Sequence, residues 1–167
     1  MTTEAERWSD PAVAARILGD FKVWAVVGAS PDPTRASHGV SRSLMRYGYE
    51  VIPIYPRETT IHGLPTVPDL RTAAAQRPPD SPIEVVDIFR ASHRAGEHVD
   101  EAIEIGARAV WLQLGVWDEA AAERADAAGL LVVMDRCPAI ELRRLGIPPR
   151  DGEVADAAAA AADGGGS

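Results

Sequence analysis

Short, continuous runs of apolar residues recur along the chain, separated by longer segments in which apolar and polar positions are mixed. An apolar run of about four to eight residues that ends at a turn-forming residue is typical of a strand buried on both faces of a parallel sheet. By this criterion the sequence predicts five strands, over Val23–Val27, Tyr49–Ile54, Ile83–Ile88, Ala109–Leu112 and Leu130–Met134.

Several of the segments between these runs have the spacing of amphipathic helices and end at glycine. Helices are predicted over Pro11–Leu18, Val40–Tyr47, a short stretch capped by Asp69 through Ala75, Ser92–Ile105, Asp118–Ala128 and Cys137–Leu145. Residues 62–68 are predicted to be a loop with one short extended piece, and the prolines between residues 78 and 82 interrupt the chain.

Strands that alternate with helices pair in parallel through right-handed crossovers, which predicts an α/β fold with a single doubly wound sheet of about five strands. The 167 residues fit one such domain. We place it at residues 11–147, after an N-terminal extension of residues 1–10 and before a flexible, acidic, Ala/Gly-rich tail of residues 148–167.

The charge balance narrows the class of ligand. Lys and Arg total 17 and Asp and Glu total 25, which gives a net charge of −8. Four of the acids and none of the bases lie in residues 151–167, so residues 1–150 carry 21 acids against the 17 bases and a net charge of −4. This balance argues against a nucleic-acid binder, which needs a basic surface, but it does not exclude a polyphosphate ligand.

Composition sets three further limits. The single cysteine, Cys137, excludes an internal disulfide framework and a cysteine-only zinc site. No apolar stretch approaches the roughly 18–20 residues of a membrane span. The first ten residues lack the apolar core of a secretory leader, so we expect a cytoplasmic protein without membrane association.

In doubly wound sheets, ligands bind outside the carboxyl ends of the strands, and there the first strand is followed by Gly28, Ala29 and Ser30. Such a loop, with backbone N–H groups and a following helix, suits an anion such as a diphosphate. Ser30 and Ser37 add hydroxyl donors, and Arg35 and His38 add charge nearby. The spacing is neither the dinucleotide Gly-x-Gly-x-x-Gly pattern nor a P-loop, and Gly28 alone is also compatible with a simple turn.

The end of the second strand refines the choice. NAD sites typically have an acidic residue there for the ribose hydroxyls, whereas this strand ends in Tyr55, Pro56 and Arg57. Arg57 would face a phosphate on the ribose, which fits NADP or coenzyme A better than NAD. The alternative interpretation is that Arg57 binds no ligand and is a solvated surface arginine beside Glu58.

Five strand-end motifs occur in one order: Val26–Ser30, Val51–Arg57, Val86–Arg90, Trp111–Gly115 and Met134–Cys137. Over residues 12–145 the chain thereby resembles the small stand-alone CoA-binding proteins, which are related to the CoA-binding domain of the succinyl-CoA synthetase alpha subunit. One departure is Tyr55, where these proteins often have Asn.

The resemblance implies a Rossmann-like domain that holds coenzyme A across the strand ends. Gly28 to Ser30 would wrap the phosphates, Pro56 and Arg57 would border the adenine and 3′-phosphate end, and Cys137 would lie near the thiol end. The full set implied for the cofactor site is Gly28, Ala29, Ser30, Arg35, His38, Val40, Pro56, Arg57, Phe89, Arg90, Gln113, Gly115, Arg136 and Cys137.

No residue pattern indicates catalysis or a resident metal. The histidines lack metal-type spacing, no Gly-x-Ser-x-Gly elbow occurs, and Cys137 is more simply a packed or ligand-contacting thiol than a nucleophile. After Leu145 the chain has 22 residues, too few for the phosphohistidine and ATP-grasp parts of a CoA ligase.

We therefore expect a non-catalytic binding protein for coenzyme A or an acyl-CoA. The alternatives are an NADP-linked oxidoreductase and a regulatory or interaction subunit that has lost its ligand. An exposed tryptophan in so small a domain would favour a homodimer.

Overall fold

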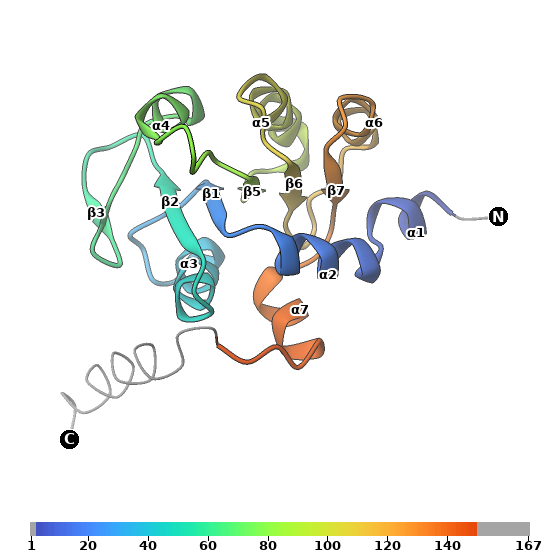
Figure 1. Ribbon diagram of the computed structural model, residues 1–167, viewed down its shortest axis with the longest axis horizontal. Coiled ribbons are helices and arrows are strands. Elements are labelled where there is room, and N and C mark those ends of the chain that lie inside the picture. The colour runs from blue at the N-terminus through green and yellow to red at the C-terminus, as the bar shows by residue number, and fades with distance from the viewer. Residues whose placement is uncertain (1–2, 150–167) are drawn as a thin grey trace.

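A parallel five-stranded sheet forms the middle layer of the molecule (Figure 1). The structure, a computed structural model, describes residues 3–149 of the chain. Its strands lie in the order β2-β1-β5-β6-β7, with β1 at Val23–Val27, β2 at Glu50–Ile54, β5 at Val85–Ile88, β6 at Ala109–Leu112 and β7 at Leu131–Val133. Every neighbouring pair is parallel. The predicted doubly wound, Rossmann-like α/β fold is therefore confirmed, and each strand lies within its predicted run.

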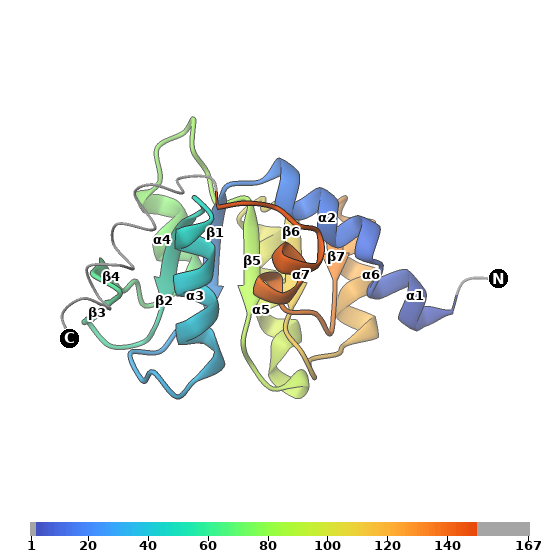
Figure 2. The same cartoon turned by 90° about the horizontal axis from the view of Figure 1, so that it is seen from below.

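Helices cover both faces of this sheet (Figures 1 and 2). One face is packed by α2 (Pro11–Asp20), α3 (Ala36–Arg46) and α7 (Pro138–Arg144), and the other by α4 (Leu70–Gln76), α5 (Ser92–Glu104) and α6 (Glu119–Ala127). Three of the helices begin after an aspartate whose side chain accepts a hydrogen bond from a backbone N–H of the first turn, namely Asp10, Asp69 and Asp118. The six predicted helices are all present.

Helix α3 begins at Ala36, earlier than the predicted start at Val40. In the first two turns of α3 the side chains of Ser37 and Ser41 are buried, at 3% and 1% exposed. Because the prediction followed apolar positions only, it missed the first turn, residues 36–39, in which the buried residue is the polar Ser37. The loop after β1 is correspondingly shorter than expected.

Residues 60–65 form a small antiparallel hairpin of β3 (Thr60–Ile61) and β4 (Leu64–Pro65), where a single extended piece was predicted. Its turn residues His62 and Gly63 have φ values of 53° and 78°, which suits a tight two-residue hairpin. Beyond β4, Val67 bonds to the end of β2 through Tyr55 N–H and Pro53 C=O. This connection brings the following loop against the carboxyl end of β2.

The N-terminal segment adds a helix, α1 (Glu4–Trp8), that the sequence did not predict. Thr3 and Glu6 close it with a capping box. Trp8 is 3% exposed and packs into the core, and its carbonyl oxygen accepts a hydrogen bond from Met134 N–H at 2.7 Å. Residues 4–10 are thus integrated with the end of β7.

None of the four tryptophans is exposed. Trp8, Trp24 and Trp111 are buried, and Trp117 is half-buried. Trp24 and Trp111 pack against each other, with ring centroids 5.7 Å apart, between the sheet and the layer of α2, α3 and α7. The homodimer stays a prediction, without this support.

Of the predicted flexible tail, only residues 148–149 belong to the part of the chain that the structure describes; the rest lies outside it. Among the described helices, none has the length and apolar character needed to cross a membrane.

Candidate functional site

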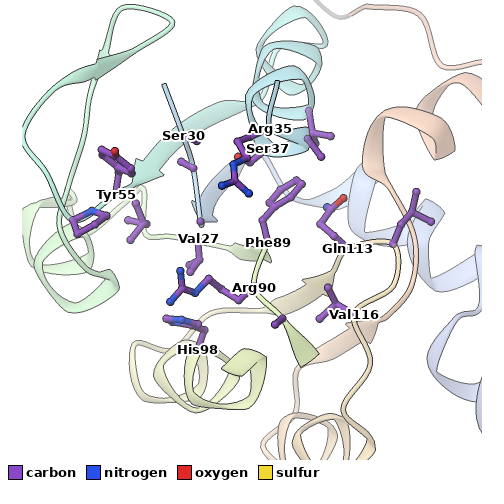
Figure 3. Close-up of a pocket in the computed structure, with 18 of the residues that line it drawn as sticks. Val27, Ser30, Arg35, Ser37, Tyr55, Phe89, Arg90, His98, Gln113 and Val116 are labelled. Carbon is purple, nitrogen blue, oxygen red and sulfur yellow. The ribbon is translucent and has the colours of Figure 1, made fainter. Parts of the chain in front are cut away.

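A cavity of about 830 Å³ opens at the carboxyl ends of β1, β2, β5 and β6. Strand β2 pairs with one side of β1, and β5, the next strand of this sheet along the chain, pairs with the other side of β1. The direction in which successive strands are added therefore reverses at β1. Ligands of open α/β sheets bind at such a switch point. Figure 3 shows the cavity with side chains from both helical layers around it.

Gly28 is the residue that turns the chain out of β1 into the cavity. Its φ is +82°, and a Cβ at this position would collide with the carbonyl oxygen of Phe89 at the end of β5. Phe89 N–H in turn donates to Val27 C=O at 2.9 Å. The close approach of the two strand ends therefore requires glycine at position 28.

The loop after Gly28 is held by its own hydrogen bonds. Ser30 Oγ accepts from Asp32 N–H at 3.1 Å, and Asp32 Oδ1 accepts from both the backbone and the hydroxyl of Thr34. The bonds from Thr34 lower the pKa of Asp32 below its usual range. Arg35 follows at the N-cap of α3 and lines the cavity together with Ser37, so this wall offers a cation and a hydroxyl.

One half of the cavity lies at the end of β2. It is lined by Tyr55, Pro56 and Pro68, the last brought there by the bridge between Val67 and β2. In Figure 3 Tyr55 stands on the far side of Val27 and Phe89 from Gln113. This half offers flat and apolar surfaces.

Arg90 and His98 line the cavity on the side of α5, across from Arg35 and Ser37 (Figure 3). His98 Nδ1 is 2.8 Å from Glu101 Oε1, and its Nε2 is 3.6 Å from Glu97 Oε1. Arg90 Nε and His98 Nε2 are buried without a hydrogen-bond partner among the described residues.

The other half lies at the end of β6, where Gln113 lines the cavity. Gln113 is 5% exposed, and its Nε2 donates to Asp87 Oδ1 at 2.5 Å. Asp87 is fully buried, and this burial raises its pKa to about 8, although the bond from Gln113 acts in the opposite direction. Around Gln113 the wall is formed by Leu114, Val116 and Cys137.

The charge of the lining is positive. Arg35 and Arg90 face the cavity, and none of the described residues that line it is acidic. A polyphosphate would be attracted there although the whole chain is acidic. Among the described residues, no group of three or more His, Cys, Asp or Glu side chains is arranged to hold a metal ion.

The structure brings most of the predicted site residues together. Those that line the cavity are Gly28, Ala29, Ser30, Arg35, Val40, Pro56, Phe89, Arg90, Gln113 and Cys137. Those outside the lining are His38, Arg57, Gly115 and Arg136.

The residues outside the lining have other surroundings. The His38 ring lies 4.1 Å from that of His62, and burial together with His62 lowers its pKa. Arg57 is exposed beside Pro56. Gly115 N–H donates to Asp135, and Arg136 is engaged inside the fold.

Ser37, expected as a hydroxyl donor beside the glycine loop, also lines the cavity. Sequence reasoning left several other lining residues out of its predicted site: Val27, Ala36, Ile54, Tyr55, Pro68, Ala91, His98, Leu114 and Val116. Some are immediate neighbours of predicted residues, and strand-end position alone could have found them. His98 is different, because it lies in the second turn of α5 and nothing in its local sequence marks it.

Known proteins match this chain in both sequence and structure. The model of the CoA binding domain family matches residues 22–143. The chain is 36% identical over 121 residues to the uncharacterized protein YneT of Bacillus subtilis (strain 168), which covers 72% of this chain and 85% of YneT.

Two solved structures have the same architecture. A hypothetical protein from Pyrococcus horikoshii OT3 has a TM-score of 0.73 and 34% identity, covering 87% of this chain and 98% of that one. A Thermus thermophilus protein has a TM-score of 0.70 and 31% identity, covering 81% of this chain and 98% of that one.

Proposed function

The chain belongs to the CoA binding domain family, and from this premise we propose that it binds coenzyme A or an acyl-CoA without transforming it. The observation that carries the proposal is the cavity at the switch point between β1 and β5, which begins at a glycine loop and has a positive lining. Such a lining suits a nucleotide with several phosphates.

The shape and chemistry of the cavity support one orientation of the ligand. The diphosphate would lie against the loop from Gly28 to Ser30, with Arg35 as its cation and backbone N–H groups as donors. The adenine would lie in the flat half formed by Tyr55 and Pro68. Arg90 would lie between the nucleotide and the arm.

The pantetheine arm would then run toward Gln113 and Cys137. This half is lined by uncharged side chains and offers the Gln113 amide as a polar contact. An arm that is apolar apart from its amide groups matches this lining. The thiol or acyl end would lie near Cys137.

Arg57 is proposed to meet the 3′-phosphate from outside the cavity. It directly follows Pro56, which lines the cavity, and its exposed side chain has no ion-pair partner among the described residues. No acidic residue follows β2 before Glu58, so the ribose-hydroxyl contact typical of NAD is missing from Tyr55 to Arg57.

Isothermal titration of the purified chain with coenzyme A, NADP and NAD tests this proposal. We expect coenzyme A to bind most tightly. Tighter binding of NADP would favour the alternative of an NADP-linked oxidoreductase, which shares the glycine loop and Arg57. If none of the three binds and native mass spectrometry shows no retained ligand, the chain would be an interaction subunit that keeps only the fold.

A further inference from the structure

Asp87 is a buried carboxyl group directly behind the cavity wall. It lies on the central strand β5, between Val26 of β1 and Trp111 of β6, and it is 0% exposed. Its Oδ1 accepts one hydrogen bond, from Gln113 Nε2, and its Oδ2 is buried without a partner among the described residues. No cation forms an ion pair with it within that part of the chain.

One amide donor does not compensate the burial of an ionised carboxylate, so the neutral acid is the favoured form. The pKa of Asp87, raised to about 8 by its burial, agrees with this expectation. At neutral pH the side chain is therefore an uncharged hydrogen-bonding group beneath the cavity.

Gln113 is the residue that connects Asp87 with the cavity. It directly follows β6, and its backbone N–H donates to Ile88 C=O at 3.3 Å, which fixes its main chain to β5. The bond to Asp87 then fixes its side-chain amide. Gln113 Oε1 has no hydrogen-bond partner among the described residues, although the side chain lines the cavity.

We propose that Asp87 is a positioning residue for ligand recognition: as a neutral acid it holds Gln113 Nε2, which leaves Gln113 Oε1 as the acceptor for an amide N–H of the ligand's uncharged arm. This inference rests on the proposed function, because the arm of coenzyme A carries such amides.

The surroundings of Gln113 make this acceptor selective. Leu114, Val116 and Cys137 form the neighbouring wall, whereas Arg35, Arg90 and His98 line other parts of the cavity. An amide N–H desolvated against this wall needs an acceptor, and a group without a donor would leave Gln113 Oε1 unpaired. The pair thus selects an amide-bearing arm at a defined distance from the phosphate loop.

The test compares coenzyme A with adenosine 3′,5′-bisphosphate, which lacks the arm. We expect Gln113→Leu to weaken coenzyme A binding about 10-fold, the effect of leaving one buried donor unpaired, and to leave the bisphosphate unchanged. Gln76→Leu is the matched control, because Gln76 is exposed at the end of α4 and outside the cavity.

Substitutions at Asp87 separate positioning from simple packing. Asp87→Asn keeps a neutral group with an oxygen that accepts from Gln113, so coenzyme A affinity should stay within about twofold of the wild type. Asp87→Leu removes the acceptor and should behave as Gln113→Leu does. If Asp87→Leu fails to fold, Gln113→Leu and Asp87→Asn still test whether Asp87 acts through Gln113.

Two results would overturn the inference. One is a Gln113→Leu protein that loses affinity equally for both ligands, or for neither. The other is an Asp87→Asn protein that folds but loses arm-dependent binding. A wild-type protein that binds neither ligand would instead refute the proposed function itself, so the two failures are distinguishable.

Discussion

Arg136 holds the carbonyl oxygen of Ser9 with two of its guanidinium nitrogens, Nε at 3.0 Å and Nη2 at 2.7 Å. Its third nitrogen, Nη1, donates to Glu141 Oε1 at 2.9 Å, and Glu141 is only 3% exposed. Arg136 therefore links the N-terminal segment to the start of α7. It stands beside Cys137, but its side chain is used within the fold.

We expect Arg136→Ala to destabilise the protein by about 3–5 kcal/mol, because it leaves the buried Glu141 carboxylate without its main cation. Urea denaturation of wild type and variant measures this loss. Arg143→Ala, which removes an exposed arginine of the same helix, is the control and should change stability by less than about 0.5 kcal/mol. If Arg136→Ala keeps its stability and loses coenzyme A affinity instead, Arg136 belongs to the ligand site as the family resemblance implied.

These contacts show what the sequence could and could not predict. The strands follow from continuous apolar runs, and the site loop follows from Gly28 at the end of the first run, since both signals are local. The role of Arg136 depends on Ser9, far away along the chain, so no local pattern contains it.

The first turn of α3 was missed for a different reason. Its buried Ser37 does not appear in an apolar periodicity, although it faces the sheet as an apolar residue would. The Asp87–Gln113 bond likewise joins two separate motifs that were each identified. Their partnership required the parallel register of β5 and β6, which the sequence implies only in outline.

Gly28→Ala should destabilise the fold and abolish ligand binding. The φ of +82° is strained for alanine, at about 1–3 kcal/mol, and the collision with Phe89 C=O adds to this cost. Thermal unfolding and coenzyme A titration measure the two effects.

Gly19→Ala is the control for this substitution. Gly19 lies within α2, its Cβ would meet nothing within 4 Å, and alanine there should raise stability by up to about 1 kcal/mol. A Gly28→Ala protein as stable as Gly19→Ala would contradict the close approach of β1 and β5.

Asp87 should make stability fall as pH rises. Its pKa is about 8 in the folded protein against about 4 in the unfolded chain, so between these values the folded state binds more protons. The stabilisation from Asp87 is therefore fully present below about pH 4 and is lost as the pH rises toward 8. Over this range the free energy of unfolding should fall with a slope approaching about 1.4 kcal/mol per pH unit.

Asp87→Asn cannot titrate and should lack this component. Denaturation at pH 5, 6, 7 and 8 should therefore show a stability difference that moves steadily in favour of the variant. Parallel curves for the two proteins would mean that Asp87 is ionised in the folded state across this range.

Arg57→Ala should weaken coenzyme A more than dephospho-CoA, because only the former carries the 3′-phosphate. Because one exposed charge-assisted contact is lost, the affinity for coenzyme A should fall roughly 5- to 10-fold, and the affinity for dephospho-CoA should change little. Arg143→Ala again serves as the control for the lost charge. Equal losses for both ligands would show that Arg57 does not recognise this phosphate.

Cys137→Ser tests whether the single thiol packs or reacts. Cys137 is 8% exposed, lines the cavity and occupies the N-cap of α7 without a side-chain capping bond. Serine is close in size and also suits an N-cap, so coenzyme A affinity should stay within about twofold and stability should change little. Isothermal titration measures the affinity, and thermal unfolding measures the stability.

A second experiment tests whether the thiol reacts. Intact mass spectrometry under non-reducing conditions, after incubation with oxidised coenzyme A, should detect any mixed disulfide on the wild type only. A strong loss of affinity in Cys137→Ser would show that the sulfur itself contacts the ligand, rather than filling the wall beside Gln113.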